Sequence, residues 1–176
     1  MRRFISVALV AFLVTAVACK RRPKKVEAEA TEETAQALLT LVHVADQRAS
    51  LQLLKGFHDI EQNAWRWTMQ KFTVTLRPPS GASQRGATLQ VKLVVPDPVI
   101  AQLRTISLSA NIEGTSLPGE TYAKPGEYVY SRDVPATVLA SDAVTVDFAL
   151  DKALRPSASD ARELGIIVSS IGLEPK

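Results

Sequence analysis

The sequence predicts an all-β protein whose folded part is a single antiparallel β-sandwich. Apolar and polar residues alternate with a period of two in most of at least seven short segments, as in strands that bury one face and expose the other. Turn-forming clusters such as Pro78-Pro79-Ser80-Gly81 and Pro125-Gly126 separate these segments. Because sheets with one solvated face are antiparallel, the pattern favours a sandwich over a parallel sheet.

The clearest predicted strand is 72–76, in which Phe72, Val74 and Leu76 share the buried face. Segments 38–45 and 164–173 are apolar on both faces and are therefore predicted to be central strands. His43, within the first of them, is predicted to be a core histidine. In chain order, the predicted strands are 38–45, 72–76, 89–93, 106–112, 126–133, 144–150 and 164–173, with short helical turns at 47–54 and 99–103.

Positive charge is concentrated at the N-terminus. The chain of 176 residues has a formal net charge of +3, and seven of its 21 basic residues fall in the first 25 positions, where there is no acidic residue. The remaining 151 residues carry 14 basic and 18 acidic side chains, so their net charge is −4. From Leu51 onward the count is 13 basic against 13 acidic residues, so the domain lacks the broad basic surface that nucleic-acid binding requires, and no nucleic-acid partner is expected.

The first 18 residues have the organisation of a secretory signal peptide. Arg2 and Arg3 precede a 15-residue apolar run, 4–18, which is shorter than the roughly 20 residues that span a bilayer. The run ends in Ala16-Val17-Ala18, the small-x-small pattern that signal peptidases recognise. A signal anchor is an alternative, because more positive charges follow the run than precede it.

Cys19, the single cysteine of the chain, directly follows this cleavage pattern. The segment Thr15-Ala16-Val17-Ala18-Cys19 resembles the lipobox of bacterial lipoproteins, in which the cysteine is acylated and becomes the mature N-terminus. Ala16 stands where a lipobox usually has leucine, and cleavage before an unmodified cysteine is the alternative. A lone thiol without a disulfide partner is a liability in an oxidising compartment, which favours acylation of Cys19.

These features predict three parts: a signal peptide at 1–18, a lipid-anchored charged linker at 19–37 and the β-sandwich domain at 38–176. The basic residues of 20–25 would lie beside the membrane, where each adds about 1 kcal/mol of attraction to anionic lipid. We therefore expect an exported lipoprotein of the bacterial cell envelope, anchored in a membrane and facing the periplasm or the cell surface.

Both tryptophans lie in one short segment. Trp65 and Trp67 are two positions apart, so an extended chain places them on the same face. If the strand register continues unbroken to 72–76, that face is the outer one, and two coplanar indoles would form a platform for sugar rings, with Glu61 and Arg66 as hydrogen-bonding groups. The alternative is a break at Met69-Gln70 that turns both indoles into the core.

Structural roles are also open for the polar residues around this segment. Glu61 and Arg66 would pair to fix the chain where the strand begins, as would Asp160 and Arg162 near the last strand. A metal site at 58–61 lacks a regular ligand spacing, and no metal is expected.

A second aromatic cluster lies in the predicted strand 126–133. Tyr128, Tyr130 and Arg132 alternate and therefore share one face. Tyr128 and Tyr130 are candidate ligand-binding residues, and ordinary sheet packing is the alternative.

The sequence offers little for catalysis. His43 and His58 are the two histidines, and neither belongs to a recognisable Ser-His-Asp arrangement, metalloprotease motif or nucleotide-binding loop. We expect no catalytic residues, no enzymatic activity and no cofactor.

Residues 51–174 resemble a jelly-roll or galactose-binding-like sandwich found in bacterial secreted and envelope proteins, similar to carbohydrate-binding modules. The resemblance rests on Gly56-Phe57 followed by Glu61 and Trp65-Arg66-Trp67, on the strand and turn of 106–114, and on the closing segment of 160–173. It implies the fold and suggests a glycan as ligand, without a sugar-contact motif that transfers residue by residue.

The expected function is that of an exported, lipid-anchored, non-enzymatic β-sandwich protein of the bacterial envelope that binds glycan. Two alternatives remain: a module that binds another envelope protein through a sheet edge or the tyrosine face, and a secreted hydrolase.

The anchor can be tested with the variant Cys19→Ser. Because acylation requires the thiol, we expect the variant to leave the membrane fraction or to stall before processing, as followed by fractionation and mass spectrometry. Identical fractionation and identical mature mass for both forms would contradict the lipoprotein prediction.

Overall fold

Nine antiparallel strands form one curved sheet in residues 37–176, the part of the chain that the computed structural model describes. The predicted signal peptide, Cys19 and the linker up to residue 36 lie outside the described residues. The elements are β1 (Leu41–His43), the 3-10 helix η1 (Gln47–Gln52), β2 (Leu53–Glu61), β3 (Trp65–Leu76), α1 (Ala82–Arg85), β4 (Ala87–Val95), α2 (Asp97–Leu103), β5 (Ile106–Ile112), β6 (Thr115–Tyr122), β7 (Gly126–Val134), the 3-10 helix η2 (Ala136–Val138), β8 (Val144–Leu150) and β9 (Ile167–Pro175).

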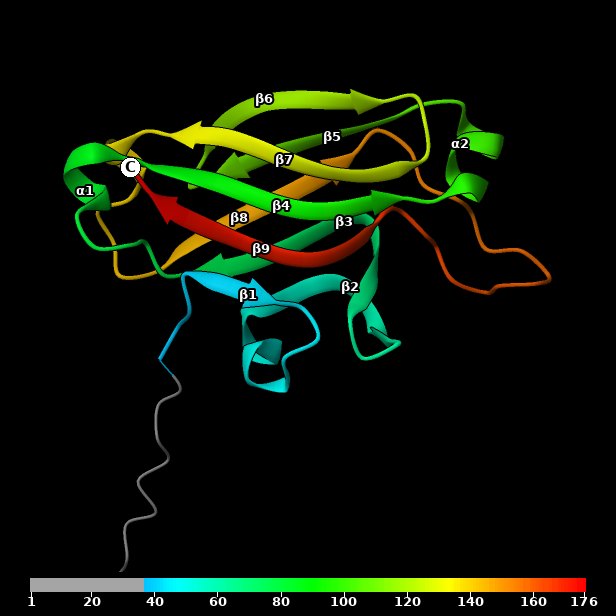
Figure 1. Cartoon of the computed structure of the whole chain (residues 1–176), viewed down its shortest axis with the longest axis horizontal. Helices are drawn as coiled ribbons and strands as arrows, with labels where there is room; N and C mark the ends of the chain where they lie inside the picture. Colours follow the sequence, from blue (N-terminus) through cyan, green and yellow to red (C-terminus); the bar gives the residue numbers. More distant parts are fainter. Residues whose placement is uncertain (1–36) are drawn as a thin grey trace, which may run out of the picture. The chain divides into compact units, whose positions relative to one another are not determined.

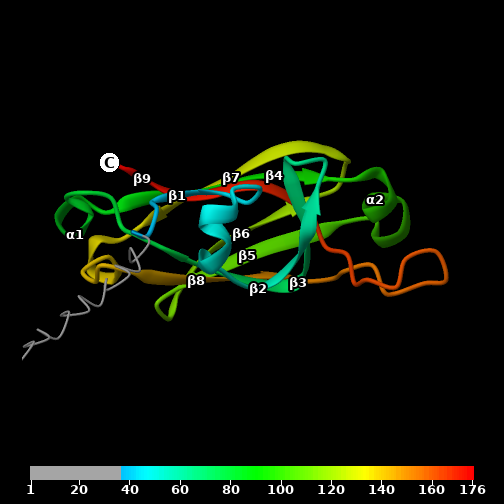
Figure 2. The ribbon, with the colours of Figure 1, turned by 90° about the horizontal axis from the view of Figure 1, so that it is seen from below.

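The sheet folds over into two layers, which confirms the predicted antiparallel sandwich. The strand order is β6-β5-β8-β3-β9-β4-β7, with β1 paired to β9 and β2 paired to β3. Strands β1, β4, β7 and β9 lie in one layer, which we call the upper layer, and β5 and β8 lie in the lower layer (Figures 1 and 2). The apolar core lies between the layers, and its largest fully buried side chains include Tyr130, Phe72 and Phe148.

Strand β3 belongs to both layers. Its first residues pair with β9 of the upper layer, through Arg66 with Val168 and Trp67 with Ile167. From Lys71 onward the same strand pairs with β8 of the lower layer. The β2–β3 hairpin accordingly rises from one layer to the other at the side of the sandwich (Figure 2).

Where β3 leaves β9 and has not yet reached β8, side chains add hydrogen bonds to the backbone bonds that Thr68 makes with Ile166 and Gly165. The fully buried Thr68 accepts the backbone N–H of Ile166 on its hydroxyl oxygen, at 3.2 Å. The Glu163 carboxylate accepts the backbone N–H of Gln70 at 2.7 Å, and the Gln70 amide donates to the carbonyl of Leu150 at 3.2 Å. Because a buried backbone group without a partner is costly, these contacts allow the strand to change layers.

A buried amide fills the gap beside β1. The Gln52 side chain is 3% exposed, accepts the Leu39 N–H at 2.9 Å and donates to the carbonyls of Leu39 and Thr75 at 3.1 and 2.8 Å. It therefore joins the segment before β1 to the far end of β3, which have no strand pairing between them.

Two predictions about the segment 38–45 were wrong. Only Leu41–His43 form a strand, and β1 pairs with β9 alone, so it is not a central strand. His43 is exposed, because it alternates with the fully buried Val42 and Val44. The prediction of a central last strand is confirmed, since β9 pairs with β4 on one side and with β1 and β3 on the other.

Strands β2 and β6 were not predicted, because bulges interrupt the alternation in both. The register of β2 shifts three times against β3. One shift lies next to Gly56, where φ is +78° and a Cβ atom would collide with the backbone of Lys71 and Phe72. Strand β6 contains Pro118-Gly119 opposite a shift in β5. The two helical turns were predicted at the right positions, as η1 and α2.

Within residues 37–176, no helix combines the length and the apolar character that crossing a membrane requires.

The role of the buried hydroxyl at the crossing can be tested with Thr68→Val, which keeps the shape and removes the acceptor of the Ile166 N–H. We expect the free energy of unfolding in urea to fall by about 1–3 kcal/mol. The control is Thr88→Val on the outer face of β4, where the side chain is half-buried. Equal losses for the two variants would contradict the special role of Thr68.

Candidate functional site

The outer face of the upper layer carries a row of side chains that crosses four strands. Trp67 of β3 lies opposite Ile167 of β9, which lies opposite Val94 of β4, which in turn lies opposite Glu127 of β7. Their neighbours in sequence, such as Val168, Leu93 and Val95, are buried between the layers, so the row itself points outward.

A groove of about 530 Å³ lies along this row. Trp65, Ile167, Val94 and Val129 give it an apolar surface, and Val129 is 51% exposed. Its polar side chains are those of Lys92, Glu127 and Ser169. An exposed aromatic ring among apolar contacts, with a few polar groups around it, is the usual composition of a small-molecule or sugar site.

The two indoles do not form the coplanar platform that the sequence suggested. Strand β3 continues without interruption through Met69-Gln70, so Trp65 and Trp67 do share the outer face. Their ring centroids are 6.4 Å apart with an interplanar angle of 78°, an edge-to-face arrangement. Both are half-buried, and Trp67 also packs against the core. Trp65 therefore offers the ring surface of the groove, and Trp67 supports it from the side.

Trp65 owes its position to the β2–β3 turn. Glu61 and Trp65 are the last paired residues, and Gln62 and Asn63 between them have φ of 50° and 54°. This left-handed conformation suits asparagine and closes a tight turn. The indole therefore stands at the end of β3 that lies beside β9.

Glu61 and Arg66 have structural partners, and they do not pair with each other as predicted. Glu61 accepts a hydrogen bond from Arg162 at 2.7 Å, and Arg162 also binds Asp160 at 2.9 Å, the second pair that the sequence suggested. These bonds attach the 151–166 loop to the β2–β3 turn. The two hydrogen bonds from Arg162 hold the pKa of Asp160 at about 2, below its usual value.

Arg66 binds two backbone carbonyls, one just after β1 and one in β2. Its Nε donates to the carbonyl of Val44 at 2.7 Å and its Nη1 to that of His58 at 2.8 Å. The His58 ring in turn bonds the Glu163 carbonyl at 2.7 Å through Nε2. These side chains fix the chain around β3 and do not line the groove.

The tyrosines of β7 close the side of the sandwich opposite β2. Tyr130 is fully buried, and its hydroxyl donates to the carbonyl of Pro118 in β6 at 2.8 Å. Burial raises the pKa of Tyr130. The Arg132 guanidinium lies 4.3 Å from the centre of the Tyr130 ring and pairs with Glu120 at 2.8 Å. The Tyr130 ring thus has no surface to offer a ligand, in agreement with the packing alternative.

Tyr128 is half-buried under the groove. Its ring packs against Tyr122, with centroids 4.6 Å apart, and its hydroxyl donates to the carbonyl of Lys124 at 3.0 Å. Tyr128 therefore contributes to the groove wall, and its hydroxyl already has a partner.

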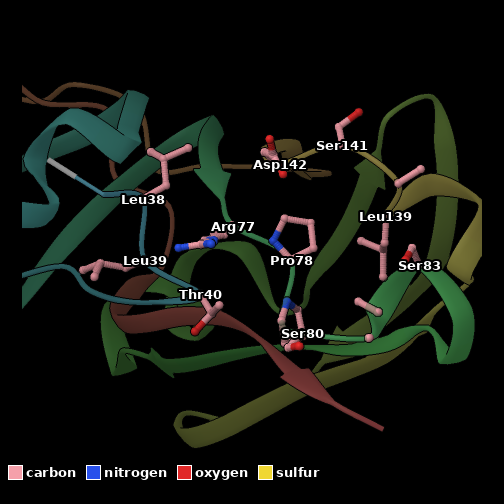
Figure 3. A pocket seen from close by; sticks show the side chains of 14 residues that line it. Leu38, Leu39, Thr40, Arg77, Pro78, Ser80, Ser83, Leu139, Ser141 and Asp142 are labelled. Atoms are coloured by element: carbon pink, nitrogen blue, oxygen red, sulfur yellow. The ribbon is translucent and has the colours of Figure 1, made fainter. Parts of the chain in front are cut away.

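A second hollow, of about 550 Å³, lies at the end of the sandwich where the described chain begins (Figure 3). The segments 38–40, 77–83 and 139–142 line it, and Arg77 and Asp142 are its charged side chains. Arg77 extends toward Leu39 and Thr40, and Asp142 lies across the hollow from Thr40 (Figure 3). No aromatic ring lines it, so it offers no stacking surface for a sugar.

No group of three or more His, Cys, Asp and Glu side chains arranged to hold a metal ion occurs among residues 37–176.

Neither a protein-family model nor a curated protein matches this chain. Solved structures with distant similarity include an acetyl xylan esterase from Butyrivibrio proteoclasticus, with 11% identity and a TM-score of 0.45 over 77% of this chain. They also include a carbohydrate-binding domain, CBM36-1, of a xylanase from the hindgut metagenome of Trinervitermes trinervoides (10% identity, TM-score 0.37, 69% of this chain and 87% of that one). A CBM4 structure has 12% identity and a TM-score of 0.37 over 77% of this chain and 85% of its own length.

The chain spans about a third of the esterase, 32% of its length. All three TM-scores lie below 0.5, and these similarities assign no function to the chain.

The structure adds residues to the site that the sequence did not suggest. Ile167, Val94, Val129 and Lys92 come from three strands that follow Trp65 by 27 to 102 positions. The strand order that makes these residues neighbours was not available from the alternation of the sequence.

The Asp160–Arg162 pair predicts an acid-dependent contribution to stability. Because the folded pKa of Asp160 is lowered to about 2, this contribution is complete above the usual pKa near 3.8 and is lost as the pH falls toward 2. We expect the urea midpoint of the wild type to fall more steeply than that of Asp160→Asn between about pH 4 and about pH 2. Parallel curves for the two proteins would contradict this assignment.

Proposed function

We propose that this protein is a non-enzymatic binding protein of the bacterial cell envelope, and that it binds glycan in the groove beside Trp65. The proposal rests on one observation. A half-exposed indole stands among outward-facing apolar side chains, Ile167, Val94 and Val129, in a groove on the outer face of the upper layer. Exposed aromatic and apolar side chains gathered on one face mark an interaction site.

The groove suits a segment of a sugar chain. The apolar C–H face of a sugar ring packs on an indole, and hydroxyl groups bond to polar side chains at the edge of the contact. Lys92 can donate such bonds and Glu127 can accept them, and Ser169 Oγ, which donates to the Lys92 carbonyl at 3.4 Å, can accept one. The groove crosses from β3 to β7, about 14 Å at roughly 4.8 Å per strand spacing, so a few rings fit across it.

Binding without catalysis follows from the carboxylates of the groove. Hydrolysis of a glycoside bond commonly requires a pair of carboxyl groups on opposite sides of the bond. Glu127 is the one carboxylate among the residues that line this groove. The groove therefore supports retention of a polysaccharide better than its cleavage, and no cofactor is part of the proposal.

The location is proposed from the sequence. The signal peptide at 1–18 and the lipobox-like Cys19 support export and a lipid anchor, which would hold the sandwich near a membrane surface.

A protein-binding module is a second candidate function, and the free edge of β7 favours it. Strand β7 pairs with β4 over nine residues without a register shift, and no strand pairs with its other edge in the described part of the chain. By contrast, the edge strand β6 carries Pro118 and a bulge, which impede strand addition. An extended segment of another envelope protein could add to β7.

The glycan proposal can be tested with Trp65→Ala by calorimetry and affinity electrophoresis against soluble polysaccharides, including xylan, mixed-linkage glucan and chitin oligomers. We expect wild type to bind at least one of them and Trp65→Ala to lose at least about tenfold in affinity, about 1.4 kcal/mol. The control is Met69→Ala, which removes a 40% exposed side chain from the same face of β3 outside the groove.

Both variants need an unchanged unfolding midpoint, so that loss of binding is not loss of fold. Absence of binding by the wild type to every polysaccharide would reject the glycan proposal. Recovery of one stoichiometric protein from membrane extract, abolished by Ser131→Pro in β7 outside the groove, would instead support the second candidate.

A further inference from the structure

The outer face of the lower layer carries an unbroken row of polar side chains across five strands. Lys55 of β2 lies opposite Thr73 of β3, and Thr73 lies opposite Asp147 of β8. Asp147 lies opposite Asn111 of β5, which lies opposite Ser116 of β6. These five residues are separated by up to 92 positions in sequence, and the pairing register alone brings them into line.

A hollow of about 350 Å³ lies beside this polar row. The next row of the sheet places Lys71 opposite Ala149, and Ala149 opposite Ser109. Ala149 has the smallest side chain of the two rows, so it forms the floor, and Lys71, Ser109, Asp147 and Asn111 stand around it. No aromatic ring other than the inward-facing Phe148 lines the hollow.

The carboxylate in this hollow is already engaged. The Thr73 hydroxyl donates to Asp147 Oδ1 at 2.6 Å, and Lys55 Nζ lies 3.9 Å from the same oxygen. Asn111 Nδ2 donates one of its two hydrogens to Ser116 Oγ at 3.3 Å, and the second hydrogen is not part of this bond. Lys71 is exposed and takes part in no ion pair among residues 37–176.

We infer that this hollow binds an oxyanion carried by a polysaccharide, a carboxylate or a phosphate ester. Two lysines and one carboxylate give it a formal charge of +1, and the side chains of Lys71, Lys55 and Asn111, all hydrogen-bond donors, line the same hollow as Ala149. A lysine ammonium is a suitable partner for either group, and its attraction is stronger in a hollow than on an open surface.

The site is independent of the Trp65 groove, because it lies on the other outer face of the sandwich and shares no lining residue with it. A polysaccharide with acidic groups would therefore bind through those groups in this hollow, and its sugar rings would stack on Trp65 at the other face. The sandwich domain, residues 38–176, carries 14 basic and 14 acidic side chains, and this lack of net positive charge disfavours a nucleic acid as the source of the phosphate.

The test uses the full chain and polygalacturonate as the carboxylate probe, with its methyl-esterified form as the neutral comparison. We expect wild type to bind polygalacturonate at low ionic strength at least about tenfold more tightly than the ester. The double variant Lys55→Gln, Lys71→Gln should lose this preference. The matched control, Lys124→Gln, removes one exposed lysine that lines neither the Trp65 groove nor this hollow, and it should keep the preference.

A second arm distinguishes the two sources of the oxyanion. Displacement of polygalacturonate by inorganic phosphate would assign a phosphate ester as a ligand. Resistance to phosphate would assign a carboxylate. Either result supports the site. Equal binding of polygalacturonate by wild type and the double variant would overturn it, as would equal binding of the charged and esterified polymers. Trp65→Ala should leave the preference intact, so failure of this inference and failure of the glycan groove are distinguishable.

Discussion

The whole sandwich depends on one constraint, which is that strand β3 must remain hydrogen-bonded while it passes from one layer to the other. Its first residues pair with β9 and its last six with β8, and Thr68, Gln70 and Glu163 supply hydrogen bonds between the two pairings. Without such partners the crossing would bury unpaired backbone groups, and the two layers would lose the strand that joins them.

The same crossing gives one strand two outer surfaces. Trp65, Trp67, Lys71 and Thr73 occupy the same face of β3, since they are separated by even numbers of residues. Because the strand changes layers between them, the tryptophans reach the outer face of the upper layer and Lys71 and Thr73 that of the lower layer. An aromatic groove and a charged polar hollow therefore arise on opposite sides of the domain, with different ligand chemistry.

The sequence predicted the strands whose alternation is regular and failed where the backbone is irregular. Strands β5 and β8 have clean alternation and were predicted at their observed bounds. Strand β2 was missed because its bulges, including the one at Gly56, shift side chains between faces. The apolar character of segment 38–45 does not mean that it is a central strand. Leu41 is 46% exposed on an edge strand, and Val42 and Val44 are the residues of this segment that enter the core.

The candidate sites were predictable only in part. Trp65 stood out by residue type, and of its two possible positions, outer face or core, the structure shows the outer face that an unbroken register required. The polar row from Lys55 to Ser116 has no local signal, because each of its residues comes from a different strand and is an ordinary outward-facing position in its own segment. Pairing order and register, which depend on long-range packing, decide which such positions become neighbours.

The most direct measurement is a two-dimensional ¹H–¹⁵N spectrum in which the two indole N–H resonances are followed during titration with a polysaccharide oligomer. The account predicts a saturable shift of the Trp65 indole together with the backbone amides of Val94, Val129 and Ile167, with a smaller shift for Trp67. Shifts confined to residues outside this groove, or none with any oligomer, would contradict it.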